Sequence, residues 1–379
     1  MQELFVIMSR SELKQFVDSG KLGITQVISP TRTISTALSI ALAENGDGQV
    51  QEPLHHLRRC SFDEGLEIIL NRAQFIQGEK EGEGKIGLVV KDIAKYVSVE
   101  EWKELLGLVD HVVFTIREPS QFLFSLVQRR ANDMVKFGSA GLSREEVLER
   151  IPNIPEKLWR DGSWERIDRL LEIAESENSG KLVIVSGLSL RFDPFGTMER
   201  LSERFGWLPF NKNMVNNWTV ASGANFFNPP PKYATSNYNT GLDEDGVVLT
   251  EYYRSAVQSS GFRPLDKEKD GPVDMKIFTS AMQEYLLGEV WPVYFRLLSH
   301  GLNISRPTIE QLNQTRCQGD LRFYQINPVE VFALLGGYSE LDDSQETIRQ
   351  QLLDGARNKL KRDHPLVLNR LGSLIAESV

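Results

Sequence analysis

The chain has 379 residues, of which 41% are hydrophobic and 25% are charged, the composition of an ordinary globular protein. It carries 43 Lys and Arg residues against 52 Asp and Glu residues, a formal charge of −9. This acidic balance argues against general binding to nucleic acid, which requires a basic surface. The two cysteines, Cys60 and Cys317, exclude a disulfide framework, so reduced thiols are expected.

The N-terminal segment lacks a basic start followed by an apolar run of signal-peptide length. No stretch approaches the run of about 18 apolar residues that a membrane span requires. We therefore expect a cytoplasmic protein without a membrane partner. The length is compatible with one large domain or two.

Short apolar runs alternate with helical patterns through the first 210 residues. Strands that alternate with helices in this way predict an α/β fold, with a central parallel sheet flanked by helices on both faces. The strands are predicted over residues 24–28, 86–90, 111–116 and 182–185. The helices are predicted over residues 9–20, 35–44, 62–77, 100–106, 120–135, 155–177 and 194–205.

The pattern changes near residue 211. Residues 211–238 are rich in Asn, Pro and aromatic side chains, and helical patterns return at 274–300, 330–335 and 344–378. We therefore predict a core over residues 1–215 and a mostly helical and irregular C-terminal region over 216–379, on the substrate side. The aromatic side chains of residues 218–238 suit stacking against an apolar or sugar ring.

The join between the first strand and its helix, residues 30–36, reads PTRTIST. It presents backbone N–H groups, a helix dipole, several hydroxyls and the guanidinium of Arg32 at one point, a combination that binds a phosphate or sulfate-like anion. The nucleoside-triphosphate loop G-x-x-x-x-G-K-[ST] is absent. The alternative is a strand–turn–helix with an ordinary cap.

A second candidate lies at the end of the strand over 111–116, because ligands of open α/β sheets bind beyond the carboxyl ends of strands. Arg117 follows this strand, and Ser125 comes eight residues later. Arg117 suits a charge-assisted contact to a phosphate, Ser125 adds a hydroxyl, and Arg129 lies one turn beyond on the same face. A lone arginine at a strand end is otherwise typical of a surface salt bridge.

The loop over residues 32–36 resembles the 5′-phosphosulfate loop of sulfotransferases, and Arg117 with Ser125 resembles their 3′-phosphate motif. Thr31 stands where that family usually has Pro, and Ile34 where it has Gly, so we expect a differently shaped loop. The resemblance covers residues 24–130 and, more loosely, 181–210. It implies a P-loop-like three-layer fold and 3′-phosphoadenosine 5′-phosphosulfate (PAPS) as co-substrate. The cofactor-binding residues it implies are Arg32, Thr33, Ile34, Ser35, Thr36, Arg117, Ser125 and Arg129.

The same resemblance suggests catalytic residues. Arg32 stands where the family stabilises the leaving group, and Lys91 is placed to touch the transferred group. The His that some members carry after this Lys is missing, whereas Glu52, in the pair Gln-Glu, stands where other members carry a catalytic Glu. Glu52 is therefore the predicted general base. His55 and its neighbour His56 are the alternative bases, since imidazole titrates near neutrality. No metal is expected, because these histidines and Cys60 have no fourth ligand at a familiar spacing.

The resemblance implies sulfuryl transfer from PAPS to a hydroxyl or amine of a small molecule or sugar, with no nucleic-acid partner. Two other functions stay open: a nucleotide-dependent kinase-like enzyme, and a non-catalytic nucleotide-binding protein of the same fold. The oligomeric state is also open.

Overall fold

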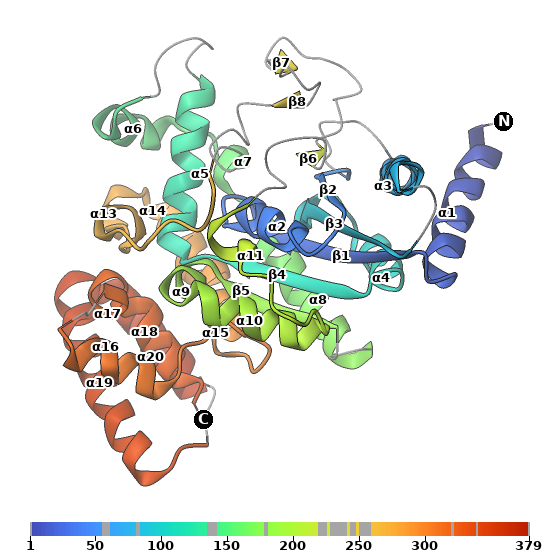
Figure 1. Cartoon of the computed structure of the whole chain (residues 1–379). Helices are drawn as coiled ribbons and strands as arrows, with labels where there is room; N and C mark the ends of the chain where they lie inside the picture. Colours follow the sequence, from blue (N-terminus) through green and yellow to red (C-terminus); the bar gives the residue numbers. More distant parts are fainter. Residues whose placement is uncertain are drawn as a thin grey trace.

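The computed structural model describes residues 2–54, 61–80, 84–134, 142–177, 181–218, 226–227, 241–242, 248–249, 259–319, 322–338 and 340–377. Its centre is a six-stranded sheet with the order β5-β4-β1-β3-β2-β6, in which every strand pair is parallel (Figure 1). The strands are β1 Leu22–Ser29, β2 Gly48–Gln51, β3 Ile86–Ile93, β4 His111–Ile116, β5 Leu182–Ser186 and β6 Phe226–Phe227.

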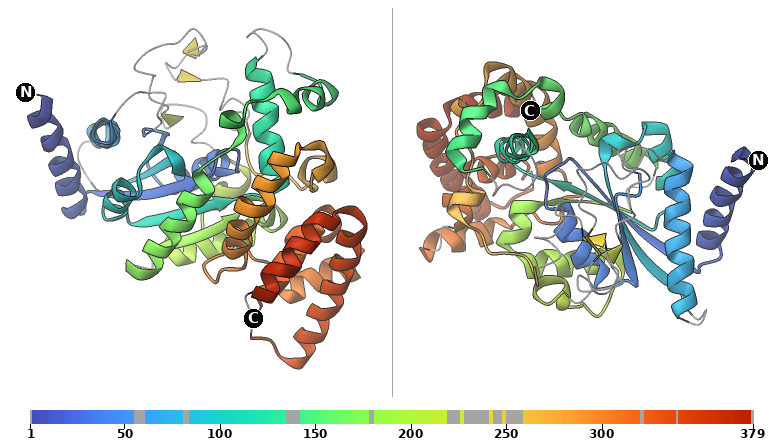
Figure 2. Two further views of the ribbon diagram at one scale, coloured as in Figure 1. Left: turned by 180° about the vertical axis from the view of Figure 1, so that it is seen from behind. Right: turned by 90° about the horizontal axis from the view of Figure 1, so that it is seen from above.

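The sheet is covered by helices on both faces, which confirms the predicted α/β fold (Figure 2). Side chains alternate between the faces along each strand. In β1, Val27 packs on one side with α2 (Ser35–Ala43), α10 (Pro194–Phe205) and α11 (Asn213–Asn216). Its neighbour Ile28 belongs to the opposite side. The helices of that side include α3 Phe62–Glu79, α4 Val99–Leu106, α5 Pro119–Met134, α8 Ser163–Glu177 and α15 Trp291–Ser299.

Strand β1 lies at the point where the order of strand addition reverses, with β3 on one side and β4 on the other. Crossover connections leave on opposite faces at such a point and open a crevice beyond the carboxyl ends of the strands. The loop over residues 30–34, the end of β4 and the end of β5 therefore share the edge of the sheet where a ligand is expected.

Three of the predicted helices are interrupted. The helix expected over 155–177 divides into α7 (Glu156–Trp159) and α8, because the carboxylate of Asp161 caps the new helix by accepting from the backbone N–H and hydroxyl of Ser163. The helix expected over 344–378 divides into α19 (Asp343–Asp363) and α20 (Pro365–Glu377), since Pro365 cannot continue α19. The region 274–300 contains η4 Met275–Ile277, α14 Ser280–Tyr285, a π-helical segment over Leu286–Val290, and α15.

Residues beyond 215 contribute to the same core as the residues before them. The outer edge of β5 is covered by residues 302–304: Ile184 N–H donates to Leu302 O at 2.8 Å, and Ile304 N–H donates to Ile184 O at 3.1 Å. At the other edge of the sheet, β6 pairs with β2. The C-terminal helices lie below the sheet in Figure 1 and share the core of that side of the sheet. The remaining helices include α1 Gln2–Asp18, α6 Arg144–Arg150, α9 Gly187–Phe192, α13 Lys267–Asp270, α16 Ile309–Cys317, α17 Arg322–Ile326 and α18 Pro328–Gly336.

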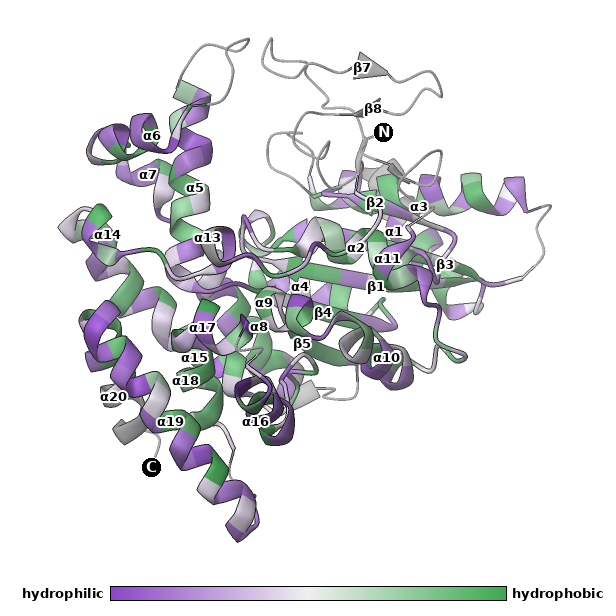
Figure 3. Ribbon diagram, turned by 60° about the vertical axis from the view of Figure 1, so that its left-hand side comes forward, coloured by the Kyte–Doolittle hydropathy of each residue, from purple (hydrophilic) through white to green (hydrophobic). Residues whose placement is uncertain are grey.

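Hydropathy follows this arrangement: the strands are mostly hydrophobic, whereas α19 carries mostly hydrophilic residues (Figure 3). Within the described part of the chain, no helix combines the length and the apolar character needed to cross a bilayer.

Candidate functional site

The loop between β1 and α2 forms the centre of the site. Its left-handed residue is Arg32, with φ of 60° and an exposed side chain. Ile34 is the N-cap of α2 with an ordinary φ of −73°, and it makes no side-chain cap. The first-turn N–H groups of α2 are therefore left without a side-chain cap, as an anion site requires. The left-handed backbone conformation of the loop thus occurs at Arg32 and not at Ile34, the residue that stands in place of the family's glycine.

The side chain of Ile34 packs against Gly187, the residue that follows β5. A Cβ atom placed on Gly187 would lie 2.9 Å from Ile34 Cγ2 and 3.2 Å from Ile34 Cβ, closer than side chains pack. The bulk of Ile34 is therefore accommodated because residue 187 has no side chain. No sequence pattern near either residue signals this pairing.

Three residues that are far apart in the sequence converge beside the loop. Arg32 Nε donates to Ser125 Oγ at 3.1 Å, and Arg117 Nη1 donates to the backbone oxygen of Arg32 at 3.1 Å. The hydroxyls of Thr33 and Thr115 lie 2.9 Å apart. The predicted 5′-loop and 3′-phosphate residues are thus adjacent, with two guanidinium groups on one side of the α2 N-terminus.

The electrostatics of Arg117 reflect this crowding. Burial and then the positive charges of Arg191 and Arg32 lower its pKa to about 10, against the opposing effect of Asp270 and Glu118. Its Nε donates to Gln121 Oε1 at 3.2 Å. The guanidinium is therefore buried beside two other guanidiniums, whose positive charges an anion would offset.

Asp161 is a residue of the site that the sequence did not reveal. Its buried carboxylate accepts a hydrogen bond from the hydroxyl of Thr31 and pairs with Lys95 Nζ at 3.3 Å. Burial opposes the ionised form, but the Lys95 charge and the hydrogen bonds from Ser163 and Thr31 outweigh it and lower the pKa of Asp161. Asp161 therefore holds Thr31, the residue that follows Pro30 in the loop, in place.

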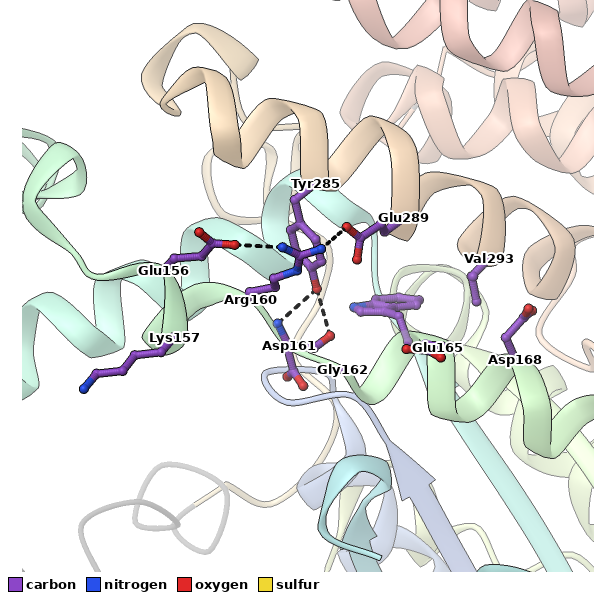
Figure 4. Close-up of a pocket in the computed structure, with 11 residues that line it drawn as sticks. Glu156, Lys157, Arg160, Asp161, Gly162, Glu165, Asp168, Tyr285, Glu289 and Val293 are labelled. Atoms are coloured by element: carbon purple, nitrogen blue, oxygen red, sulfur yellow. Dashed lines mark hydrogen bonds and ion pairs between the residues drawn. The ribbon is translucent and has the colours of Figure 1, made fainter. Parts of the chain in front are cut away.

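The backbone of Asp161 also forms one wall of a cavity of about 810 Å³ (Figure 4). The hydroxyl of Tyr285 donates to Asp161 O at 2.8 Å and accepts from Asp161 N–H at 3.1 Å. At the rim, Arg160 pairs with Glu156 at 2.8 Å and with Glu289 at 2.5 Å. Asp161 thus links the cavity to the loop through its hydrogen bond with Thr31.

Glu52 and Lys91 form an ion pair that is almost entirely buried. Lys91 lies opposite Val27 of β1 and Gln51 of β2, so its side chain shares with Val27 the face that α2 covers. Glu52, directly after β2, has φ of 50° and donates its N–H to Lys91 O at 2.6 Å. Neighbouring strands are about 4.8 Å apart. Because β2 is two strands away from β1, the backbone of Glu52 lies about 10 Å from β1 across the sheet.

The remaining predicted residues are placed as follows. Ser35 is buried and begins α2, and Thr36 follows it, with its carbonyl accepting from Ser39 Oγ at 2.8 Å. Arg129 pairs with Asp133 on its own helix at 3.0 Å. His55, together with His56 and Cys60, lies outside the described residues. Among the described residues no group of three His, Cys, Asp or Glu is arranged to hold a metal ion.

No family model matches the chain, and no curated protein matches it. Among solved structures, the chain is similar to the sulfotransferase domain from the curacin biosynthetic pathway. The identity is 13%, the similarity covers 71% of this chain and 97% of that chain, and the TM-score is 0.40. A similarity with so low a TM-score indicates no function, so the function proposed below rests on the residues of the site.

Proposed function

We propose that the chain is a sulfotransferase that binds PAPS at the loop between β1 and α2 and transfers its sulfuryl group to a hydroxyl or amine. One observation carries the proposal: Arg32, Ser125 and Arg117 meet at the uncapped N-terminus of α2. Two guanidiniums, a hydroxyl and free helix N–H groups form a donor set that matches a ligand with two separate phosphate-type groups.

The chemistry of sulfuryl transfer assigns roles to these residues. PAPS supplies the sulfuryl group, and its bisphosphate part departs with negative charge on the bridging oxygen. In this proposal Arg32 meets the growing charge, while the first turn of α2 with Thr33, Ser35 and Thr36 holds the 5′ end. Arg117, Ser125 and Arg129 hold the 3′-phosphate. The ion pair with Glu52 positions Lys91 at the same edge, where it touches the transferred group.

Glu52 is the base in this proposal, and its geometry supports that role in one respect. Lys91 and the left-handed backbone hold its carboxylate at the carboxyl edge of the sheet, on the side of the anion loop. A base must also reach the acceptor hydroxyl or amine through at most one water. The acceptor site is a small-molecule site, and of the residues 218–238 that are predicted to stack against an acceptor ring, 219–225 and 228–238 lie outside the described residues.

Thermal unfolding with nucleotides tests the proposal directly. Adenosine 3′,5′-bisphosphate should raise the Tm more than adenosine 5′-phosphate or ATP does, because a ligand stabilises the state that binds it. Arg117→Ala should abolish this preference, whereas Arg169→Ala, which removes a surface arginine paired with Glu165 on α8, should retain it. A preference for ATP would support the kinase-like alternative instead. Tight binding of the bisphosphate without turnover of PAPS over a broad acceptor panel would support the non-catalytic alternative.

A further inference from the structure

A second group of arginines surrounds the carboxylate of Asp270, the last residue of α13. Asp270 is completely buried. Arg263 donates to its two oxygens at 2.8 Å each, and Arg191 Nη2 lies 2.5 Å from Oδ1. One buried carboxylate thus neutralises two guanidinium groups, one of which, Arg191, is itself almost fully buried.

This group is connected to Arg117 by hydrogen bonds. Gln121 Oε1 accepts from Arg117 Nε, and Gln121 Nε2 donates to the backbone carbonyl of Asp270. Arg191 Nε donates to Gly187 O at 3.3 Å, and Gly187 is the residue that packs against Ile34 of the anion loop. Arg117 and Arg191 follow β4 and β5, which are adjacent strands.

The charges of the combined cluster do not balance. The buried guanidiniums of Arg117 and Arg191 lie close enough for the charge of Arg191 to act on Arg117, and the one carboxylate directly paired with either of them among the described residues is that of Asp270, which Arg263 also binds. Burial and the charge of Arg263 lower the pKa of Arg191, and Asp270 opposes this effect. Two buried like charges that lie close together, as those of Arg117 and Arg191 do, gain most from an anion that carries more than one negative charge.

We infer that Arg191 is a further binding residue of the phosphate subsite that Arg117 and Ser125 form, and that Asp270 positions it there. This inference rests on the proposed function. The ligand class is a phosphate monoester in its dianionic form. Among the described residues, Arg191 Nη1 and Arg117 Nη2 have no hydrogen-bond partner. Each guanidinium therefore keeps a donor for such a ligand.

A purely structural role of Arg191, in which its ion pair with Asp270 joins α9 to α13, is the alternative to phosphate binding. Arg263 supplies the matched control, because it pairs with the same carboxylate at 2.8 Å. The two arginines differ in their surroundings: Arg191 is almost fully buried and its charge lowers the pKa of Arg117, whereas Arg263 is 43% exposed and its charge lowers the pKa of Arg191. A purely structural role predicts similar effects of the two substitutions on stability and no effect of either on nucleotide preference.

The test measures Kd by isothermal titration calorimetry for adenosine 3′,5′-bisphosphate and adenosine 5′-phosphate, with the full chain and with Arg191→Gln and Arg263→Gln. The preference of the unsubstituted chain for the bisphosphate should fall about 10-fold in Arg191→Gln, the loss expected for one charge-assisted hydrogen bond. Affinity for adenosine 5′-phosphate should stay unchanged, and Arg263→Gln should keep the full preference.

Two results overturn the inference. If the unsubstituted chain shows no preference for the bisphosphate, the proposed function fails and the role of Arg191 fails with it. If the unsubstituted chain shows the preference and Arg191→Gln retains it, only the role of Arg191 is wrong. Should Arg191→Gln not fold, Arg191→Lys keeps the charge but not the fork of donors. It should show a partial loss of preference that grows with ionic strength, and an undiminished preference would again overturn the inference.

Discussion

Glu330→Gln should make the protein more stable at alkaline pH. Glu330 lies on α18 and is completely buried. Its Oε1 accepts from the hydroxyl of Ser186, at the end of β5, and from Ser189 Oγ at 3.1 Å. Its Oε2 and the hydroxyl of Tyr294 have no hydrogen-bond partner among the described residues. Gln has the same shape, and its amide oxygen accepts the same two hydrogen bonds.

The magnitude follows from the pKa of Glu330, which rises from an ordinary value of 4.5 to about 7. Burial is the main cause; hydrogen bonds from Ser186 and Ser189 oppose it, and the charge of Glu118 adds to it. The folded state thus keeps a proton that the unfolded state releases above pH 4.5, so stability falls as pH rises between these two values. The total loss is about 3 kcal/mol once both states are ionised. The amide of Gln has no carboxyl proton to release, so Glu330→Gln avoids this loss of stability.

Urea unfolding at a series of pH values from about 5 to 8 measures the effect. The free energy of unfolding of Glu330→Gln, relative to the unsubstituted chain, should increase with pH and level off above about pH 7. Glu310→Gln is the control, because a hydrogen bond from its own backbone N–H and a second one from Gln345 lower the pKa of this exposed carboxyl. Its relative stability should stay constant above about pH 6. Parallel curves for Glu330→Gln and the unsubstituted chain would refute the reasoning.

Three further substitutions test the site. Gly187→Ala should destabilise the fold by about 1–3 kcal/mol through overpacking, and adding Ile34→Ala should restore part of this loss in urea unfolding; additive losses would contradict the contact. Asp161→Asn should lower stability at neutral pH, because the depressed pKa of Asp161 contributes stability above its unfolded pKa that is lost as pH falls. The stability difference between this variant and the unsubstituted chain should therefore shrink in acid; a difference independent of pH would argue against an ionised Asp161. Glu52→Gln should reduce turnover of PAPS by about 10²–10⁴ with nucleotide affinity unchanged. Normal turnover by Glu52→Gln, together with lost turnover by His55→Ala, would give the role of base to His55.

The sequence was sufficient to predict the features that depend on local patterns. Strand β4 occupies the predicted residues 111–116, because an uninterrupted apolar run bounded by polar residues has few alternatives. The positions of Arg32 and Arg117 after β1 and β4 then followed from the rule that ligands bind at the carboxyl edge of such a sheet. Their contact through the backbone oxygen of Arg32 needed the strand order as well.

Other parts of the site depend on contacts that no local pattern carries. Asp161 stands within a helical pattern, and its contact with Thr31 joins residues 130 positions apart in the chain. The same holds for Arg191 and Asp270, which the fold brings together from opposite sides of the predicted boundary at residue 215. Gly187 looks like an ordinary glycine until the side chain of Ile34 is in place. The roles of these residues are set by neighbours that are close in space but distant in the sequence, so the tertiary structure is needed to recognise them.

Backbone strain provides a separate argument for the site. Among the described residues, the non-glycine residues with positive φ are Arg32 and Glu52. A left-handed conformation costs such a residue about 1 kcal/mol or more, and glycine at either turn would avoid that cost. Each is held by a neighbouring strand: Arg117, after β4, donates to Arg32 O, and Lys91 O, in β3, accepts from Glu52 N–H. The turns alone do not require an arginine and a glutamate, so the side chains account for the strain, and both lie at the edge where the ligand is proposed to bind.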